Sequence, residues 1–414
     1  MLNPKILQDS LSYSKIWIAY SGGVDSQVLL NLCAEFRAIN PELSLKAVHI
    51  HHGISQHADV WVNHCQQVCM NLNIPLEVVK VQLTRRNELG LEAAAREERY
   101  RVFADLIAEN ELLLTAHNAN DQAETLLLQL LRGAGPKGLS AMPIKKPLGR
   151  GFLWRPLLAV SRAEIEGYAK SHALKWIEDE SNLVEDYPRN FIRHQIMPKL
   201  LELSPAALET LARSAAHCAE SSRLLEELAA EDLNKIKTEN AHCLHLQLLK
   251  QFSTDRQTNV LRYWFKILNF ALPETRHLAV LFEQINAKHD AQPLVCWADV
   301  ECRRFDDCLY VMRPLKPISK LSFAWPEEKE LLRAELGSEK IAHIESTLKK
   351  VSNQTETKDI IILRFRQGGE RCKIQGRQGT HELKKLFQEW KIPPWERERT
   401  PLIYINDVFV GAIN

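Results

Sequence analysis

A glycine-rich turn near the N-terminus has the residue types of a phosphate-binding loop. It lies between an apolar run and an amphipathic one and reads Ser21-Gly22-Gly23-Val24-Asp25-Ser26. Glycines let backbone N–H groups approach an anion, and a helix that begins in the turn adds its positive end. The Ser21 and Ser26 hydroxyls can donate to phosphate oxygens, and the Asp25 carboxylate suits Mg²⁺ beside phosphates. No lysine completes the pattern of P-loop kinases and GTPases, so the turn predicts another kind of nucleotide site.

Two carboxylates farther along the chain are spaced to act together. Asp121 and Glu124 are three residues apart at the expected start of a helix, so they share one face. A pair of carboxylates can hold an ammonium group, or one of them can accept a proton as a general base. His117 directly precedes this helix and is placed to contact a phosphate or a base. We therefore predict a catalytic group that contains Asp25, His117, Asp121 and Glu124.

Three arginines are candidates for binding anions. Arg96 lies in an expected helix and can neutralise phosphate charge. Arg189 and Arg193 are four residues apart on an expected helical turn, where guanidinium groups can bind phosphates or a carboxylate. We expect Arg96 to be catalytic, and Arg189 and Arg193 to contact substrate.

The first 140 residues alternate short apolar runs with longer amphipathic stretches, which is typical of a parallel sheet covered by helices. Ligands bind such sheets beyond the carboxyl ends of the strands. The expected strands are Lys15–Tyr20, Leu45–Ile50, Leu76–Val81 and Glu111–Ala116. The expected helices are Asp25–Phe36, Ala58–Leu72, Leu91–Glu109 and Asn120–Arg132. The glycine-rich turn and His117 each follow one of these strands.

The remainder of the chain predicts smaller units. Residues 133–155 are rich in Gly, Pro and basic residues and predict a long loop, whereas Ser161 is placed to cap a helix that ends near Leu174. A helix is expected from Ser204-Pro205 to about Lys237. We predict an α/β fold with a parallel-sheet catalytic domain and two smaller mixed α/β C-terminal domains. The expected segments are a catalytic domain at 1–215, a helical or mixed substrate-binding domain at 216–320, a linker at 321–355 and a small C-terminal domain at 356–414.

Composition narrows the class of protein. The 414 residues are 45% hydrophobic and 25% charged, as in globular proteins, and 53 Lys and Arg against 52 Asp and Glu give a net charge of +1. No apolar stretch reaches the 18 or so residues that cross a bilayer, and the N-terminus lacks the shape of a signal peptide. We expect a soluble cytoplasmic protein with no membrane partner and no obligate protein partner. The nine cysteines include no CxxC pair, which disfavours zinc ribbons and redox dithiols.

The string SGGVDS at 21–26 resembles the PP-loop of the ATP pyrophosphatase superfamily. The resemblance implies that ATP is cleaved between its α- and β-phosphates, that AMP is transferred to an oxygen, and that a nucleophile then displaces AMP. Ammonia, sulfur and amines serve as nucleophiles in this superfamily. The missing CxxC disfavours sulfur, no amidotransferase domain is recognisable, and an amine remains.

Motifs farther along resemble the tRNA(Ile)-lysidine synthetase family over nearly the whole chain. In order they are VHIHHG at 48–53, EAAAR at 92–96, TAHNANDQAET at 115–125, RPL at 155–157, DESN at 179–182, PRNFIR at 188–193, FRQGGE at 365–370, ELKKLF at 382–387 and PPWER at 393–397. The resemblance implies ATP and Mg²⁺ as cofactors. It implies free L-lysine and an isoleucine tRNA with a CAU anticodon as substrates. The family usually has two adjacent acids before Gln122, but this chain has Asn120 and Asp121.

The same resemblance implies that ATP adenylates O2 of the wobble cytidine and that the ε-amine of lysine then attacks C2. The tRNA must be bound as well. Residues 361–400 carry ten Lys and Arg against five Asp and Glu, with aromatic residues interleaved, and are suited to RNA. A second basic and aromatic stretch contains Lys145, Lys146, Arg150, Trp154 and Arg155.

Two alternatives stay open at this point. One is a PP-loop enzyme that modifies tRNA with another nucleophile, such as a thiolase. The other is a non-catalytic tRNA-binding protein that keeps a relict nucleotide loop.

Overall fold

A computed structural model describes residues 2–53, 57–82, 91–178, 188–285, 294–352, 360–373 and 379–413. The chain divides into two compact units, Met1–Glu227 and Leu228–Asn414. Among the described helices, none combines the length and the hydrophobicity needed to cross a membrane.

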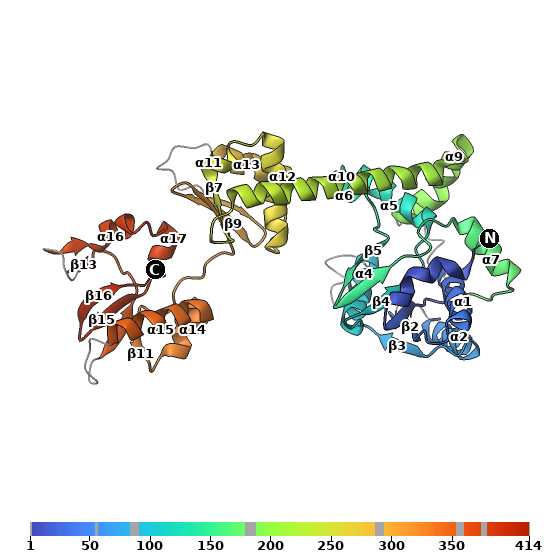
Figure 1. The fold of residues 1–414 in the computed structure, drawn as a ribbon, viewed down its shortest axis with the longest axis horizontal. Helices are drawn as coiled ribbons and strands as arrows, with labels where there is room; N and C mark the ends of the chain where they lie inside the picture. Colours follow the sequence, from blue (N-terminus) through green and yellow to red (C-terminus); the bar gives the residue numbers. More distant parts are fainter. Residues whose placement is uncertain are drawn as a thin grey trace. The chain divides into compact units, whose positions relative to one another are not determined.

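The first unit contains a six-stranded sheet in the order β3-β2-β1-β4-β6-β5 (Figure 1). All neighbours are parallel except β5 and β6, which are antiparallel. The strands are β1 (Lys15–Ala19), β2 (Leu45–His51), β3 (Leu76–Lys80), β4 (Glu111–Leu114), β5 (Lys145–Leu148) and β6 (Gly151–Trp154). The parallel α/β architecture predicted for the N-terminal part is thus confirmed, and the four expected strands correspond to β1 to β4.

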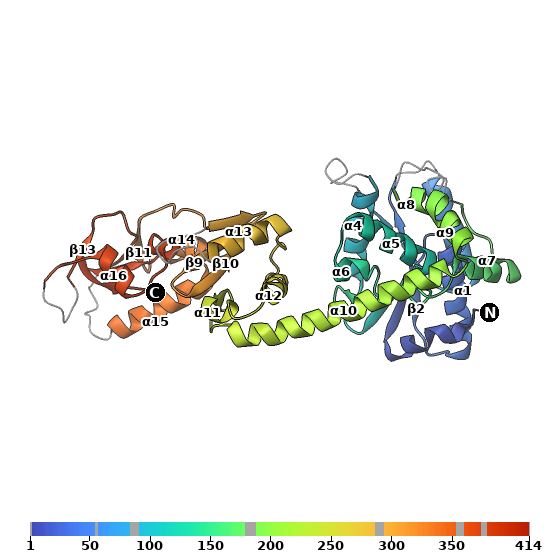
Figure 2. The ribbon, with the colours of Figure 1, turned by 90° about the horizontal axis from the view of Figure 1, so that it is seen from above.

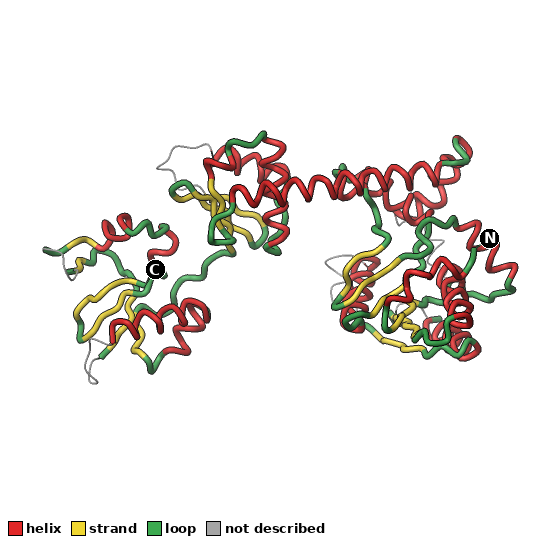
Figure 3. Tube along the Cα trace, in the orientation of Figure 1, coloured by secondary structure: helices red, strands yellow, loops and turns green. Residues whose placement is uncertain are grey.

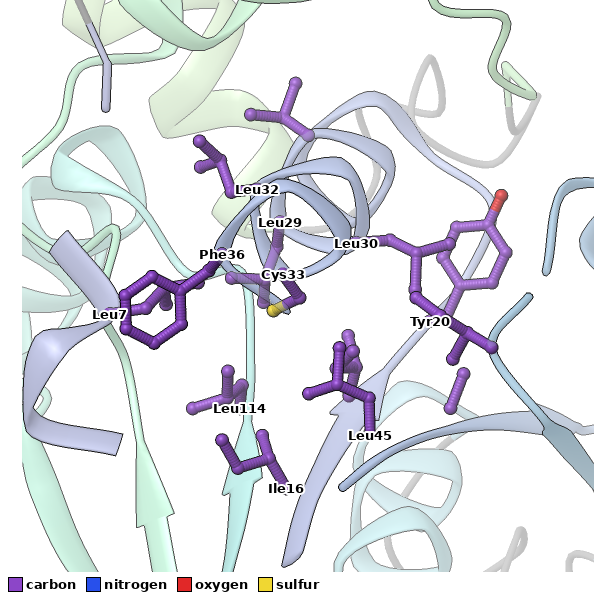
Figure 4. Packing of buried hydrophobic residues seen from close by; sticks show 14 of the residues in the cluster. Leu7, Ile16, Tyr20, Leu29, Leu30, Leu32, Cys33, Phe36, Leu45 and Leu114 are labelled. Carbon is purple, nitrogen blue, oxygen red and sulfur yellow. The ribbon is translucent and has the colours of Figure 1, made fainter. Parts of the chain in front are cut away.

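Helices cover both faces of this sheet because its strands are apolar on both sides. The helices and helical turns of the unit are η1 (Pro4–Ser12), α1 (Val24–Ile39), α2 (Ala58–Asn71), α4 (Leu91–Leu106), α5 (Ala119–Leu131), α6 (Pro136–Leu139), α7 (Arg162–Ser171), α8 (Pro188–Phe191), η3 (Ile192–Ile196) and α9 (Met197–Leu203). Ile16 and Ile18 of β1 pack with α1, where Leu29, Cys33 and Phe36 lie over the strands (Figure 4). Trp17, between them, packs on the opposite face with Phe103 of α4. The alternation of side chains along β1 therefore holds a helix on each side of the strand.

The prediction of a long loop over 133–155 is wrong. This segment forms α6 and the hairpin of β5 and β6, and β6 extends the sheet beside β4. The hairpin turns at Gly149, which has φ +56° and whose Cβ, if present, would lie 2.2 Å from the Ala104 carbonyl oxygen. Gly and Pro are poor strand formers, so the composition favoured a loop; pairing with β4 and close packing on α4 decide otherwise.

The second unit contains two four-stranded sheets with antiparallel neighbours, β7-β10-β9-β8 and β11-β12-β15-β16, and a two-stranded sheet (Figure 3). Its C-terminal domains are thus antiparallel-sheet domains with helices. Its strands are β7 (Cys243–His245), β8 (Leu294–Trp297), β9 (Val300–Phe305), β10 (Cys308–Met312), β11 (Ser322–Trp325), β12 (Ile361–Arg364), β13 (Arg371–Cys372), β14 (His381–Glu382), β15 (Leu402–Ile405) and β16 (Val408–Ala412). Its helices are α11 (Leu246–Leu249), α12 (Thr254–Ile267), α13 (Thr275–Ile285), α14 (Lys329–Leu336), α15 (Ser338–Ser352), α16 (Leu383–Glu389) and α17 (Pro394–Arg397).

The expected helix near 204–237 is α10 (Ala207–Ile236), a single helix of 30 residues that crosses the division between the units (Figure 2). Its last turns belong to the second unit, where Ile236 joins a hydrophobic core. Residues 321–355 were expected to be a linker with one helix. The structure instead shows β11, α14 and α15 there, and Phe323, Leu332 and Ile344 are buried in the core with β12. Apolar residues spaced for a helix face explain this burial.

Candidate functional site

The candidate site lies where the strand order of the first sheet reverses. The strand β1 has β2 on one side and β4 on the other, so the loops that follow β1 and β4 leave the sheet side by side. Such a switch point is where α/β sheets bind ligands. The loop after β1 is the predicted PP-loop, and the loop after β4 carries His117 and Asn118.

The PP-loop is closed by its own serines. The Ser26 hydroxyl donates to the Gly23 carbonyl at 2.9 Å, and the Ser21 amide donates to Ser26 Oγ at 3.2 Å. The helix α1 begins directly after Gly23, which has no side chain to cap the first N–H groups. These N–H groups and the positive end of α1 are suited to bind an anion, which is the role predicted for this loop.

Gly22 is required for this shape. Its φ is +91°, and a Cβ at this position would lie 2.7 Å from Ile177 Cδ1 and 3.2 Å from Cys65 Sγ. The Gly22 carbonyl also accepts a hydrogen bond from the Ile177 amide at 2.9 Å. The loop therefore packs against Ile177 and Cys65 on one side, and a side chain at position 22 would push the loop out of place.

Gly22→Ala should lower the free energy of unfolding by about 2–4 kcal/mol, because left-handed strain and overpacking add. Gly337→Ala is the control for backbone strain without overpacking, since Gly337 has φ +86° and ψ 162° with open space around it, and should cost about 1–3 kcal/mol. Urea unfolding of the full chain measures both, with ATP affinity measured in parallel. Equal losses in the two variants would show that packing against Ile177 is unimportant.

Asn118 connects the two loops. Its Nδ2 donates to Asp25 Oδ1 at 2.9 Å, and its Oδ1 accepts the Asp121 amide at 3.1 Å. Asp121 Oδ2 accepts the Asn118 amide in return, which completes a capping box at the start of α5. Asp25 and Asp121, which are far apart in sequence, are thereby held on either side of one amide side chain.

The negative charge of Asp25 is partly balanced by a nearby arginine. Its Oδ2 lies 3.7 Å from Arg162 Nη1, at the start of α7. Burial raises the pKa of the Asp25 carboxyl above its ordinary value; Arg162 opposes this, whereas Asp121 adds to it. A cation bound beside Asp25 would relieve the mutual repulsion of these two carboxylates.

The structure joins Asp121 and Glu124 to Arg189 and Arg193. Glu124, which is 1% exposed, accepts from Arg189 Nε at 2.8 Å and from Arg193 Nε at 2.7 Å. Asp121 Oδ1 accepts from Arg189 Nη2 at 3.0 Å and lies 3.3 Å from Arg193 Nη2. Burial alone would lower the pKa of Arg193, but Glu124 and Asp121 raise it. The four side chains have no net charge, so the two carboxylates predicted to bind an ammonium are already neutralised by the two arginines predicted to bind anions.

His117 is held beside this group without charge. Its Nδ1 lies 3.0 Å from Thr115 Oγ1. Burial lowers the pKa of His117 to about 3; Asp121 opposes the change, and Arg155, Arg189 and Arg96 reinforce it. At neutral pH the imidazole is therefore neutral and can act as a hydrogen-bond partner.

This pKa sets a pH dependence of stability. Because the folded pKa is below the unfolded value of about 6.5, the unfolded chain binds a proton that the folded chain rejects. The contribution of His117 to the free energy of unfolding is fully present above about pH 6.5. It decreases as the pH falls toward 3, by up to about 1.4 kcal/mol per pH unit. His117→Gln should remove this contribution, which urea unfolding at pH 4 to 7 measures. Identical slopes for both proteins would contradict the assignment.

Three residues that shape the site were not predicted from the sequence. Asn118 had a local signal, since Asn followed by Asp three residues later is a capping pattern. Arg162 had none, because only the packing of α7 brings it to Asp25. Asn120 Oδ1 accepts the Arg162 amide at 3.0 Å, so the residue that departs from the family pattern ties α5 to α7.

Arg96 lies on α4 with its guanidinium 5.1 Å from the Tyr100 ring. The DESN motif at 179–182 lies outside the described residues.

The cysteines nearest the loop are not poised for chemistry. Cys65 and Cys69 of α2 are buried, and burial raises the pKa of each to about 12. A thiolate is thus disfavoured at both positions, which speaks against sulfur chemistry by these residues. Within the described ranges, no group of three or more His, Cys, Asp or Glu side chains is arranged to hold a metal ion.

Comparison with known proteins identifies three domains along the chain. Residues 3–200 match the PP-loop domain, residues 244–310 the TilS substrate binding domain, and residues 361–414 the TilS substrate C-terminal domain. The chain is 42% identical to a tRNA(Ile)-lysidine synthase of Coxiella burnetii, over 99% of this chain and 90% of that protein. It is 39% identical to the one of Serratia proteamaculans, over 100% and 93%, and 40% identical to the one of Legionella pneumophila strain Paris, over 98% and 92%. With relatives this similar over almost its whole length, the chain belongs to the tRNA(Ile)-lysidine synthase family.

Proposed function

We propose that this chain joins free L-lysine to the wobble cytidine of an isoleucine tRNA with a CAU anticodon. O2 of the cytidine attacks the α-phosphorus of ATP and releases diphosphate. The ε-amine of lysine then forms a C–N bond to C2, the C2–O bond breaks, and AMP leaves. The product is lysidine, which changes codon reading from AUG to AUA.

The observation that carries this proposal is the bridge from Asp25 through Asn118 to Asp121. It brings the PP-loop and the carboxylate group to one switch point of the sheet. A reaction that first transfers AMP and then admits an amine needs both parts within reach of one base. The identity to lysidine synthases over the whole chain supports the choice of lysine as the amine.

The PP-loop residues Ser21 to Ser26 are proposed to bind the phosphates of ATP through the amides at the start of α1. A magnesium ion fits beside Asp25, because Mg²⁺ in such sites is held by one or two carboxylates together with phosphate oxygens and water. When bound, it would neutralise negative charge on the phosphates. Asp25 has the partly exposed carboxylate that this requires, with 26% of its side chain accessible.

The carboxylates are proposed to act differently from each other. Asp121 is 16% exposed and is suited to contact the ammonium of lysine, whereas Glu124 is enclosed and holds Arg189 and Arg193 in place. The ε-ammonium has a pKa near 10.4 and must lose a proton before it can attack. Asp121 is the group we propose to receive that proton. Neutral His117 is proposed to contact the adenylated base, and Arg96 to offset phosphate charge.

We propose that the tRNA is bound by the later segments, 216–320 and 356–414, while 1–215 performs the chemistry. The matches to substrate-binding and C-terminal domains support this division. Basic residues of 361–400 would then contact phosphates, so affinity should decrease as salt increases.

Incorporation of radiolabelled lysine tests the proposal. Wild-type protein, ATP and Mg²⁺ are incubated with a transcript of isoleucine tRNA that has the CAU anticodon, and an elongator methionine tRNA with the same anticodon is the control. We expect ATP-dependent label on the isoleucine transcript alone. Folded protein that labels neither transcript would reject lysidine synthesis.

A further inference from the structure

A cluster of cations surrounds Tyr100 at the edge of the first sheet. Lys146 of β5 lies with its Nζ 4.7 Å from the ring centroid, and Arg96, one turn earlier on α4, lies 5.1 Å from it. Arg155, which follows β6, donates from Nη2 to the Tyr100 hydroxyl at 3.4 Å. Three separate elements of the fold thus bring positive charge to one phenol. We call Arg96, Tyr100, Lys146 and Arg155 the Tyr100 cluster.

The positive charge of this cluster is not balanced by any carboxylate that the structure describes. Among the described residues, no carboxylate forms an ion pair with Arg96, Lys146 or Arg155, whereas Arg189 and Arg193 each have two such partners. Arg155 is 2% exposed, and its Nε has no hydrogen-bond partner among the described residues. Its Nη1 donates to the Pro143 carbonyl at 2.6 Å. A buried guanidinium without an anion costs free energy, so the arrangement calls for a negatively charged ligand.

Electrostatics within the cluster agree with this interpretation. Burial by itself would raise the pKa of Tyr100, but Arg96, Arg155 and Lys146 lower it. Burial lowers the pKa of Lys146, and both arginines lower it further. The cations therefore repel one another at close range, and a bound anion would relieve that repulsion.

The cluster borders the catalytic group, because Arg155 directly follows Trp154, whose carbonyl accepts the Thr115 amide at 3.1 Å two residues before His117. Arg155 and Arg96 accordingly lower the pKa of His117. We propose that Lys146, Arg155 and Arg96, arranged around Tyr100, bind a backbone phosphate of the RNA next to the cytidine that reacts. This inference rests on the proposed function. Lys146 and Arg155 are then positioning residues, which hold the nucleotide while the base reaches His117 and Asp121.

Two other anions are less well matched to the cluster. The phosphates of ATP have a site of their own at the start of α1. The carboxylate of lysine carries one charge, whereas the cluster presents three cations. A nucleic acid backbone offers repeated phosphates, and Arg96 at the exposed side of the cluster can be reached by it.

The test is binding of an unmodified isoleucine tRNA transcript with a CAU anticodon to the full chain, without ATP or lysine, at several salt concentrations. Lys146→Gln should weaken binding about tenfold and reduce the slope of log affinity against log salt by about 0.7–1. Lys146→Arg should restore most of the affinity. Tyr100→Phe, which keeps the ring, should weaken binding about threefold through loss of the hydroxyl that orients Arg155. Lys170→Gln is the matched control, since Lys170 is exposed on α7, and should leave the affinity and the slope unchanged.

The KM values for tRNA, ATP and lysine show which of these substrates supplies the anion that the Tyr100 cluster binds. Lys146→Gln should raise KM for tRNA and leave KM for ATP and for lysine within twofold of wild type. An increase confined to KM for lysine or to KM for ATP would overturn the proposal, and so would unchanged tRNA affinity in both Lys146→Gln and Tyr100→Phe. If Lys146→Gln and Lys170→Gln weakened tRNA binding equally, the loss would reflect only the overall charge of the protein, and the proposal would be overturned. Because binding is measured without turnover, failure of lysine transfer in the wild type would reject the proposed function separately.

Discussion

Asp25→Ala is expected to reduce lysine transfer by about 10³-fold or more, because it removes the carboxylate that we propose to act beside the phosphates of ATP when the adenylate forms. The folded state should be affected much less. Asp25 carries a carboxylate whose pKa is raised by burial, so its removal also takes away an unfavourable charge beside Asp121. Transfer of radiolabelled lysine and thermal unfolding of the same preparations measure the two effects.

Two variants make this result specific. Asp25→Asn keeps the size of the side chain and can still contact Asn118, but it should be nearly as inactive as Asp25→Ala because it lacks charge. Asp105→Ala removes a carboxylate from the exposed side of α4, where it pairs with Arg101 at the surface, and should keep full activity. If Asp25→Ala transferred lysine as fast as the wild type, Asp25 would take no part in the reaction. If neither protein transferred lysine, the PP-loop would be a relict and the chain would be a tRNA-binding protein without catalysis.

Glu124→Gln is expected to have the largest effect on stability. The substitution leaves the guanidinium groups of Arg189 and Arg193 facing a neutral amide in a buried place, which typically costs about 3–5 kcal/mol. Lysine transfer should fall as well, because the two arginines and Asp121 share one network. Urea unfolding measures the first effect, and kcat and KM for lysine measure the second.

Asp121→Asn and Asp232→Asn separate the two roles of this network. Asp121 is more exposed than Glu124, so Asp121→Asn should cost less stability but raise KM for lysine or lower kcat more strongly. Asp232 is fully buried on α10 and pairs with Arg256 in the second unit. Its replacement by Asn should destabilise the chain without changing KM for lysine. If Glu124→Gln were as stable as the wild type, the carboxylate would not be what holds the arginines.

Local patterns were sufficient for the N-terminal architecture and the nucleotide loop. A buried parallel strand such as β1 requires an apolar run, and α1 requires an apolar stripe, so both can be recognised from neighbouring residues alone. The PP-loop is also a local object, because its shape depends on glycines and serines within six residues. Residue type and spacing then placed Asp121, Glu124, Arg189 and Arg193 among the candidate residues, although they suggested a ligand for each of them rather than a partner in the protein.

Packing between distant segments decided the rest. Arg189 and Glu124 are 65 residues apart, and only the docking of α8 against α5 brings them to 2.8 Å. The charge and spacing of these residues indicate that each can form an ion pair, but they do not indicate which partner it takes. The β5 and β6 hairpin was missed for a related reason, since its stability comes from pairing with β4 and from contact with α4. The Tyr100 cluster depends on that hairpin, because β5 supplies Lys146 and the end of β6 leads to Arg155. Interactions of this kind depend on distances across the fold, which no short stretch of sequence encodes.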